Sequence, residues 1–145
     1  MDFPIVDLLD DEMSIVWLQT HFHPQGLKCP SCHAGVEQAR EFRRTKTSGL
    51  VVYRCRACHG VYNLYSDTVF EGCHLRPSQV VLFVREVCKG EPTATLAREL
   101  NVCRQTALGR RRRLQANGEK LQPTTPLSDA RTETDEMFQN AGEKR

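Results

Sequence analysis

The sequence predicts a small α+β zinc protein, and three observations carry that prediction. Two Cys-x-x-Cys pairs are separated by 22 residues, short β-branched stretches lie between and after them, and apolar residues at helical spacing follow. With 145 residues and a mean hydropathy of −0.49, the chain has room for one modest domain or two very small ones. The expected order is an acidic N-terminal helix (1–27), a zinc ribbon (28–74), a three-helix helix-turn-helix module (75–116), and a linker with a largely disordered tail (117–145).

The first helix is predicted over Asp10–Thr20. Acidic residues occupy its first turn, where the positive end of the helix dipole favours them. Met13, Val16 and Trp17 share one face at helical spacing, and the string "HFHPQG" then ends the helix. This apolar face predicts a lid packed on the ribbon, which is a structural role.

The seven cysteines point to a metal rather than to disulfides. A secreted disulfide framework favours an even number of cysteines and a signal peptide, whereas this N-terminus is acidic. Four of the seven form the pairs Cys29–Cys32 and Cys55–Cys58. Each pair can present two thiolates at about 2.3 Å from one ion, and two pairs complete the tetrahedral shell of Zn²⁺. A thioredoxin-like redox site is the weaker alternative, because no βαβ pattern surrounds either pair.

The predicted zinc ion is structural. A segment of about 45 residues buries too little apolar surface to fold alone, and structural zinc contributes on the order of 10–16 kcal/mol in small fingers. Four protein ligands leave no open position for a substrate. Of the other candidates, His33 and His59 follow the two pairs and are expected at the surface. The three single cysteines are expected to be small buried residues: Cys73, Cys88 and Cys103.

Three strands are predicted around the cysteine pairs. Residues 37–45 and 49–55 are extended, polar and β-branched stretches on either side of "KTSG", which indicates a hairpin. A third strand is predicted over residues 60–66, after the second pair. Two cysteine turns and three short antiparallel strands are the pattern of a zinc ribbon.

Three helices are predicted after the ribbon. Val80, Phe83, Val84 and Val87 follow helical spacing, with Pro77 near the start of that helix and a glycine just past its end. The next helix begins at a threonine cap and is followed by a tight turn at residues 101–102. The last helix is predicted over residues 103–114. A short turn before the last of three helices indicates a helix-turn-helix module, and a plain three-helix bundle with a cationic end is the alternative.

The charge distribution agrees with a nucleic-acid partner. Residues 28–120 contain 17 Lys or Arg against 8 Asp or Glu, whereas residues 1–27 contain five acids and no Lys or Arg. An ordinary solvated basic face is the alternative. In a helix-turn-helix module the start of the last helix reads base edges, and later basic residues contact phosphates. The candidate DNA contacts are Arg104, Gln105 and Leu108 for the bases, with Thr106 near the rim, and Arg110, Arg111, Arg112 and Arg113 for the phosphates.

The order of these parts resembles the N-terminal region of insertion-sequence transposases with a zinc ribbon. The strings "HPQGLKCPSC", "YRCRAC", "SDTVFEG" and "LARELNVCRQTA" add to this resemblance, which extends from about Asp10 to Lys144. In such transposases a linker leads to a nuclease core of the DDE type, whose first strand ends in a carboxylate. The resemblance therefore implies that Asp135, in "TETDEM", is the first acidic ligand of a truncated core. A plain acidic tail is the alternative.

The sequence departs from the family pattern in its last helix. Arg110 and Arg111 stand where the family usually has apolar residues, and Gly109 in the middle of a helix costs about 1 kcal/mol relative to Ala. Either the arginine stems lie along the core with their heads in water, or the helix is frayed. Cys103 stands where Ser would be a better N-cap.

These observations predict a truncated transposase that binds double-stranded DNA, with terminal inverted repeats as the expected target, and that is not an enzyme. Cleavage needs two Mg²⁺ ions held by carboxylates from several strands, and Asp135 with its neighbour Glu136 cannot build that site. The alternatives are a protein-interaction module that binds full-length transposase, and a repurposed transcription regulator. The longest apolar runs have about five residues, against roughly 20 for a membrane helix, so we expect a cytoplasmic protein without a membrane partner.

Overall fold

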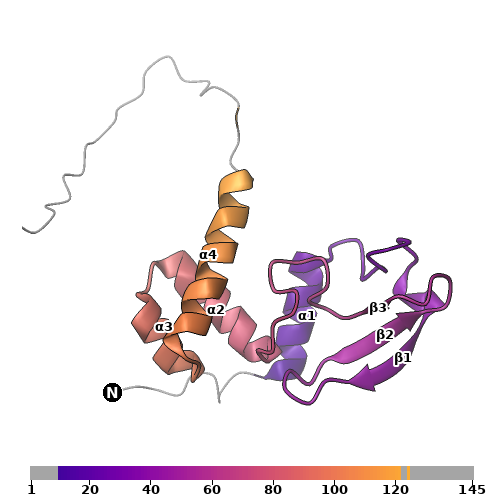
Figure 1. Cartoon of the computed structure of the whole chain (residues 1–145), viewed down its shortest axis with the longest axis horizontal. Helices are drawn as coiled ribbons and strands as arrows, with labels where there is room; N and C mark the ends of the chain where they lie inside the picture. The colour runs from indigo at the N-terminus through magenta and orange to yellow at the C-terminus, as the bar shows by residue number, and fades with distance from the viewer. Residues whose placement is uncertain (1–9, 122–123, 125–145) are drawn as a thin grey trace, which may run out of the picture.

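The chain forms a three-stranded antiparallel sheet beside a group of helices (Figure 1). A computed structural model describes residues 10–121 and 124. This arrangement confirms the α+β class. Within the described residues the elements are α1 (Asp11–Phe22), the short 3-10 helix η2 (Val36–Gln38), β1 (Ala39–Arg44), β2 (Val51–Cys55), β3 (Val61–Tyr62), α2 (Pro77–Lys89), α3 (Thr93–Leu100) and α4 (Arg104–Lys120).

Helix α1 begins where it was predicted and ends two residues later. The side chain of Asp10 caps it by accepting a hydrogen bond from the Glu12 N–H at 2.9 Å. The side chain of the next residue, Asp11, accepts a hydrogen bond from the Ser78 N–H at 3.1 Å. The first turn of α1 is thereby fixed against the start of α2.

The apolar face predicted for α1 is not the face that packs on the core. Leu18 is fully buried, whereas Met13, Val16 and Trp17 are 71%, 64% and 38% exposed. Ile15 packs against the core on the same side as Leu18. Apolar residues surround almost the whole helix, so their spacing could not determine which face would be buried. The prediction that the face of Met13, Val16 and Trp17 packs on the ribbon is therefore wrong.

The sheet has the strand order β1-β2-β3, and both pairings are antiparallel. Strands β1 and β2 form the predicted hairpin, whose turn is closed by a hydrogen bond from the Thr45 N–H to the Leu50 carbonyl at 2.9 Å. Gly49 in this turn has a φ of 68°, which glycine adopts without strain. Strand β3 is shorter than predicted because the Ser66 N–H bonds to the Asn63 carbonyl and turns the chain.

Helices α2 and α3 have the predicted boundaries within one residue or two, but the N-cap of α3 is Pro92 rather than a threonine, so the predicted threonine cap is wrong. Gly90, with a φ of 79°, ends α2, and Asn101, with a φ of 54°, ends α3. Gln79 joins the two helices: its side chain accepts from the Arg76 N–H at 2.9 Å and donates to the Leu100 carbonyl at 2.8 Å.

Helix α4 begins after Cys103 and continues to Lys120, six residues beyond the predicted end at Leu114. Residues 115–120 contain no proline, and Gly118 lies within the helix rather than ending it. The helix therefore crosses the expected boundary between residues 116 and 117. The rest of the predicted linker and tail, apart from residue 124, lies outside the described residues.

One apolar core joins the helices to the segment that follows the sheet. Its centre includes fully buried Phe83, which meets Phe70 edge-on at 5.9 Å between ring centroids. Tyr65 is also buried, and its hydroxyl donates to the Leu75 carbonyl at 2.8 Å. The core residues are Leu18, Leu50, Leu64, Tyr65, Phe70, Cys73, Leu75, Val80, Leu82, Phe83, Leu96 and Leu100.

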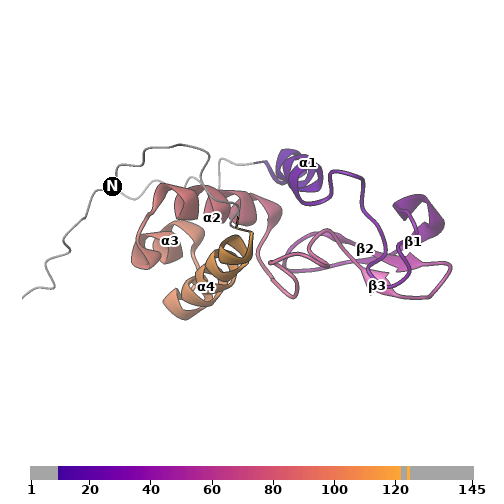
Figure 2. The same ribbon diagram turned by 90° about the horizontal axis from the view of Figure 1, so that it is seen from above.

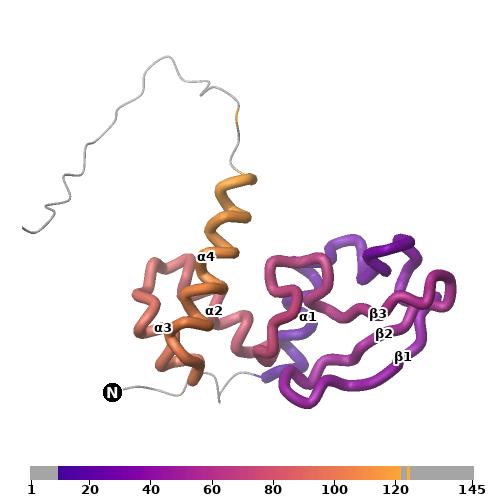
Figure 3. Tube along the Cα trace, in the orientation of Figure 1, coloured from indigo at the N-terminus to yellow at the C-terminus, as the bar shows by residue number. Residues whose placement is uncertain are grey.

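The chain path shows how this core forms. After β3 the chain runs beside α1 to the start of α2, so residues 63–76 lie between the sheet and the helices (Figure 3). Seen from above, α1 lies on one side of the sheet, and α4 lies on the side of α2 that faces away from α1 (Figure 2).

Of the single cysteines, only Cys73 is buried as predicted. Cys88 and Cys103 are exposed, so the prediction that they are buried is wrong. Cys88 lies in the last turn of α2, next to exposed Lys89. Cys103 is the N-cap of α4, where its sulfur accepts a hydrogen bond from the Thr106 N–H at 3.4 Å. A capping side chain must face the open end of its helix, which is why Cys103 is accessible.

Candidate metal centre and candidate nucleic-acid interface

The two Cys-x-x-Cys pairs fold into turns with the same hydrogen bonds. In the first turn the His33 N–H donates to the Cys29 carbonyl at 2.9 Å, and in the second the His59 N–H donates to the Cys55 carbonyl at 3.1 Å. Both histidines have a positive φ, of 60° and 61°. In each turn the N–H of the first cysteine also donates a hydrogen bond to the carbonyl five residues later, that of Ala34 or of Gly60. The repeated geometry places two sulfurs on the inner side of each turn.

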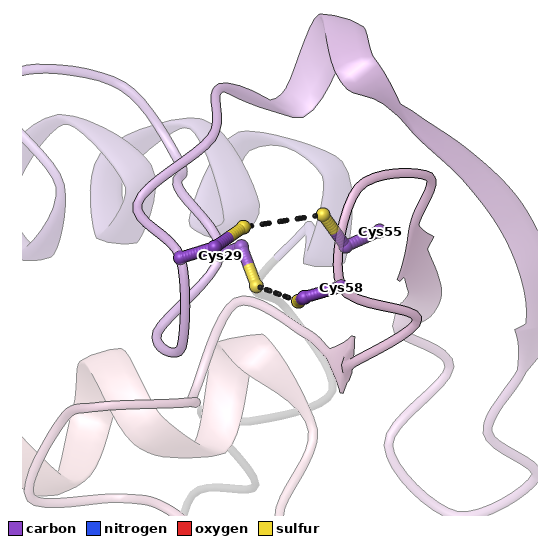
Figure 4. Close-up of side chains that lie close together, drawn as sticks. Cys29, Cys55 and Cys58 are labelled. Carbon is purple, nitrogen blue, oxygen red and sulfur yellow. Dashed lines mark hydrogen bonds between the residues drawn. The ribbon is translucent and has the colours of Figure 1, made fainter.

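The four sulfurs face one another across these turns (Figure 4). The Sγ atoms of Cys29 and Cys58 are 3.4 Å apart, and those of Cys32 and Cys55 are 3.5 Å apart. All four lie within 4.8 Å of one another. Four sulfurs around one zinc ion at about 2.3 Å are separated by about 3.8 Å, whereas a disulfide has sulfurs about 2.05 Å apart. The spacing therefore fits one tetrahedral ion and excludes disulfides between the pairs.

The backbone of each turn favours the thiolate form of its first cysteine. The backbone N–H of Cys32 is the main cause that lowers the pKa of Cys29 to about 7. The backbone N–H of Cys58 lowers the pKa of Cys55 in the same way. A thiolate is the form that binds zinc. The first cysteine of each pair, on the buried side of the centre, therefore loses its proton more readily than a free thiol.

The second cysteine of each pair depends on the ion itself. An N–H from Ala34 lowers the pKa of Cys32, but the hydrogen bond with the Cys55 sulfur and burial raise it to about 12. Cys32 and Cys58 are exposed, whereas Cys29 and Cys55 are buried. A bound divalent cation deprotonates a coordinating thiol outright. The donor set fits a soft cation such as zinc, and an ion is required for all four sulfurs to be anionic together.

Gly60 is a residue of this centre that the sequence analysis missed. A Cβ atom at this position would lie 3.2 Å from the Cys58 sulfur and 3.6 Å from the Cys29 sulfur. Any larger side chain would therefore press on two of the four ligands. The signal in the sequence was the glycine two residues after the second pair, in "CRACHG". The two histidines, by contrast, are exposed as predicted.

The candidate DNA contacts divide into two groups on α4. Arg104, Gln105 and Thr106 are exposed in its first turn, and Arg112 and Arg113 are exposed further along. Within the described residues, these three arginines make no hydrogen bond or ion pair in the fold. All the ion pairs of that part of the chain lie instead around the end of α2 and the turn after it: Arg85–Glu86, Lys89–Glu86 and Lys89–Glu91.

Arg110, Arg111 and Leu108 are held closer to the body of the protein. The guanidinium of Arg111 donates to the Glu91 carbonyl and, at 3.5 Å, to the Thr93 hydroxyl, and it thereby joins α4 to the turn between α2 and α3. Arg110 donates to the carbonyl of Glu71 at 3.4 Å. All three predicted contacts are half-buried. The helix is therefore regular at these two arginines, but their guanidinium groups are bonded to backbone carbonyls rather than held in water as expected.

The remaining predicted site residue, Asp135, lies outside the described residues. Comparisons with protein-family models, with curated proteins and with solved structures found no match. Across residues 10–121, none of the helices is both long enough and apolar enough to cross a membrane.

Proposed function

We propose that this chain is the DNA-binding fragment of a transposase. In this proposal the sheet and its two cysteine turns are a zinc ribbon, helices α2, α3 and α4 are a helix-turn-helix module, and α4 is the recognition helix. The observation that carries the proposal is the set of cationic side chains on α4 that form no hydrogen bond or ion pair within the described residues: Arg104, Arg112 and Arg113. Basic residues concentrated on one exposed helix are the electrostatic footprint of nucleic-acid binding.

The roles of the individual side chains follow from their positions. Arg104 and Gln105, at the start of α4, have the donors that recognise guanine and adenine in the major groove. Arg112 and Arg113 would bind phosphates, which orient the protein without reading sequence. Arg110 and Arg111 would act indirectly, since their contacts with backbone carbonyls hold α4 in place.

The proposed activity is binding to the ends of a mobile element. The zinc ion would be structural, because four cysteine ligands leave no position for water or substrate. The resemblance to transposases assigns Asp135 to the start of a nuclease core.

The first test is binding to duplex DNA, measured by fluorescence anisotropy at about 50 and about 200 mM salt, with and without a zinc chelator. Six or more phosphate contacts should cost at least about 10³ in affinity between those two salt concentrations. We expect salt-dependent binding that the chelator abolishes. A zinc-loaded, folded protein that fails to bind would refute the proposal.

A second test separates base reading from phosphate contact. With an element end as probe and a scrambled duplex as control, Arg104→Ala should lose the preference between the two. Arg112→Ala should weaken binding to both duplexes alike and reduce the salt dependence by about one phosphate. If the two variants behave identically, α4 does not read bases through its first turn.

A protein-interaction module is the second candidate, and the outer face of α1 favours it. Met13, Val16 and Trp17 are exposed together, and the Trp17 ring stacks on His21 at 4.1 Å between centroids. In this alternative the fragment binds full-length transposase through α1. Purified fragment should then form a complex with full-length transposase in size-exclusion chromatography, and Val16→Asp should abolish that complex. If the fragment and full-length transposase form no complex, α1 does not have this role.

A further inference from the structure

The outer face of the three-stranded sheet has the composition of a second DNA contact. Directly opposite residues in an antiparallel pair lie on the same face. Arg40 pairs with Arg54, Arg43 pairs with Val52, and Arg54 also pairs with Val61. These residues therefore share one face of the sheet, even though the pairing shifts between Glu41 and Arg43.

The opposite face is the one that α1 covers. Arg44 pairs with Val51, and Glu41 pairs with Tyr53, so these residues alternate with the first set. Arg44, Val51 and Tyr53 line a groove of about 320 Å³ whose other wall is formed by Glu12 and Ile15 of α1. The arginines at positions 40, 43 and 54 consequently lie on the side of the sheet that faces away from α1.

This outer face is cationic, and the described residues supply no ion pair to its arginines. Arg40 and Arg43 are exposed, and none of the ion pairs within the described residues involves a strand residue. Two arginines placed directly opposite each other destabilise a sheet, and Arg40 and Arg54 are such a pair. The buried Nε of Arg54 has no hydrogen-bond partner in the described part of the chain. An anion between these side chains would relieve both costs.

Two exposed apolar side chains accompany the arginines. Phe42 is 48% exposed, and the guanidinium of Arg54 lies 5.7 Å from the centre of its ring. Val61 is 51% exposed on the same face. Strand β1 is also an edge strand, and only its first residue is half-buried. Val52 on this face is buried and Arg54 is half-buried, so the exposed part of the surface is formed by Arg40, Phe42, Arg43 and Val61.

The outer sheet face and α4 face the same side of the molecule. Figure 2 shows α1 above the sheet and α4 below α2, so α4 lies toward the side that the sheet turns away from α1. On α4, Ala107 is buried and Arg111 is tied to the turn before α3, so the exposed Gln105 and Arg112 point away from the core. A long, straight polyanion that contacts α4 could extend along the molecule to the sheet.

We propose that the outer face formed by Arg40, Arg43 and Arg54 binds the phosphate backbone of the same DNA duplex, beside the segment that α4 contacts. This inference rests on the proposed function for its partner, and it adds a second surface. The arginines supply charge to phosphates, and Phe42 and Val61 pack against sugars. A duplex rather than a single strand is favoured because one rigid ligand can span both surfaces.

The test uses a matched set of variants in the zinc-loaded full chain. Arg40→Gln/Arg43→Gln removes two charges from the outer face. The single variants Arg40→Gln and Arg43→Gln each remove one charge from the outer face. The control, Arg44→Gln, also removes one charge, but from the neighbouring position that faces α1. Binding is measured by anisotropy with mixed-sequence duplexes of about 10 and about 25 base pairs. Zinc content and thermal unfolding establish that each variant is folded.

We expect the double variant to lower the slope of log affinity against log salt by about two on the longer duplex, because each phosphate contact contributes roughly 0.9. Each single outer-face variant should lower it by about one, and Arg44→Gln should leave it nearly unchanged. On the short duplex, which α4 alone can occupy, the double variant should bind like the wild type.

The outcomes separate this inference from the proposed function. If wild type binds no duplex, both fail. If wild type binds but Arg43→Gln and Arg44→Gln are indistinguishable on the longer duplex, the sheet surface is refuted and the role of α4 stands. If single-stranded DNA of equal length binds tighter and shows the same loss in the double variant, the assignment to a duplex is overturned. If the outer-face variants lose binding while Arg112→Ala does not, the sheet contact stands and the role of α4 fails.

Discussion

The sheet region and the helical region of this protein are stabilised by different means. Around the cysteine turns only a few residues are buried: Leu27, Cys29, Cys55 and Tyr62. The helical region contributes to a core of twelve residues, among them fully buried Phe83 and Leu96. Two of the four residues in the smaller cluster are metal ligands by geometry. We therefore expect the first region to depend on a bound ion and the second on apolar burial, so that each responds to a different perturbation.

The largest expected effect is metal removal. Structural zinc sites contribute on the order of 10–16 kcal/mol in small domains, so a chelator or Cys29→Ser should unfold the sheet region. Hydrogen exchange should lose protection in β1 and β2 while α2 and α3 retain part of theirs. Cys88→Ser, at an exposed position outside the centre, is the matched control and should change neither region. Unchanged exchange in a demonstrably metal-free protein would show that the sheet does not depend on an ion.

The second largest effect is expected from a substitution that destabilises the helical region and leaves the metal centre intact. Phe83→Ala removes a fully buried ring that meets Phe70, and such a substitution costs about 3–5 kcal/mol. The helices should lose stability in chemical denaturation, while zinc still binds in the stoichiometry of one ion per chain. Met13→Ala, at a position 71% exposed, should change stability by no more than about 0.5 kcal/mol. Loss of zinc binding in Phe83→Ala would mean that the two regions fold only as one unit.

A smaller effect distinguishes two adjacent arginines of α4. Arg111→Ala removes the contacts with Glu91 and Thr93 and should cost about 1.5 kcal/mol of stability, the lower range for hydrogen bonds of a charged group. Arg112→Ala removes no contact within the described structure and should leave the melting temperature unchanged. In DNA binding we expect the opposite order once both proteins are folded. Equal melting temperatures for the two variants would contradict the structural role given to Arg111.

The smallest effect concerns two glycines of the same helix. A Cβ atom added at Gly109 or at Gly118 would meet nothing within 4 Å, so either Gly→Ala change should stabilise α4 by about 1 kcal/mol. Gly109 lies between the first turn of α4 and Arg112, on the surface proposed to meet DNA. Gly109→Ala should therefore weaken DNA binding despite its gain in stability, whereas Gly118→Ala should not. If the two variants gain the same stability and bind DNA with the same affinity, the DNA does not contact α4 at Gly109.

The metal centre was predictable because its signal is local. Four cysteines in two short pairs carry their geometry in their spacing, and the structure brings those four sulfurs together. The hairpin and the boundaries of α2 and α3 were likewise marked by residues with strong backbone preferences, such as Gly90 and Asn101. In each case a few neighbouring residues determine the outcome.

The buried face of α1 and the environment of Arg111 were not predictable in this way. Apolar residues occur on every side of α1, and only the positions of α2 and of the segment after β3 determine that Leu18 is covered and Val16 is not. The sequence predicts Arg111 to be a phosphate contact, because the carbonyl that it actually binds belongs to Glu91, twenty residues away. Such partners are set by tertiary packing, which short-range patterns do not encode. The same holds for Gly60, whose constraint comes from sulfurs that meet only in the fold.

The bond from the Ser78 N–H to Asp11 also has a consequence for how the chain folds during synthesis. Helix α1 leaves the ribosome long before α2, so its packing partner on the core is absent while residues 28–58 are made. The fourth cysteine, Cys58, emerges before any part of α2. The four cysteines can therefore bind the ion before α2 is made. Residues 29–58 are then cross-linked, which shortens the loop that must close when α1 packs against α2. The ion would thus set the order of folding as well as its outcome.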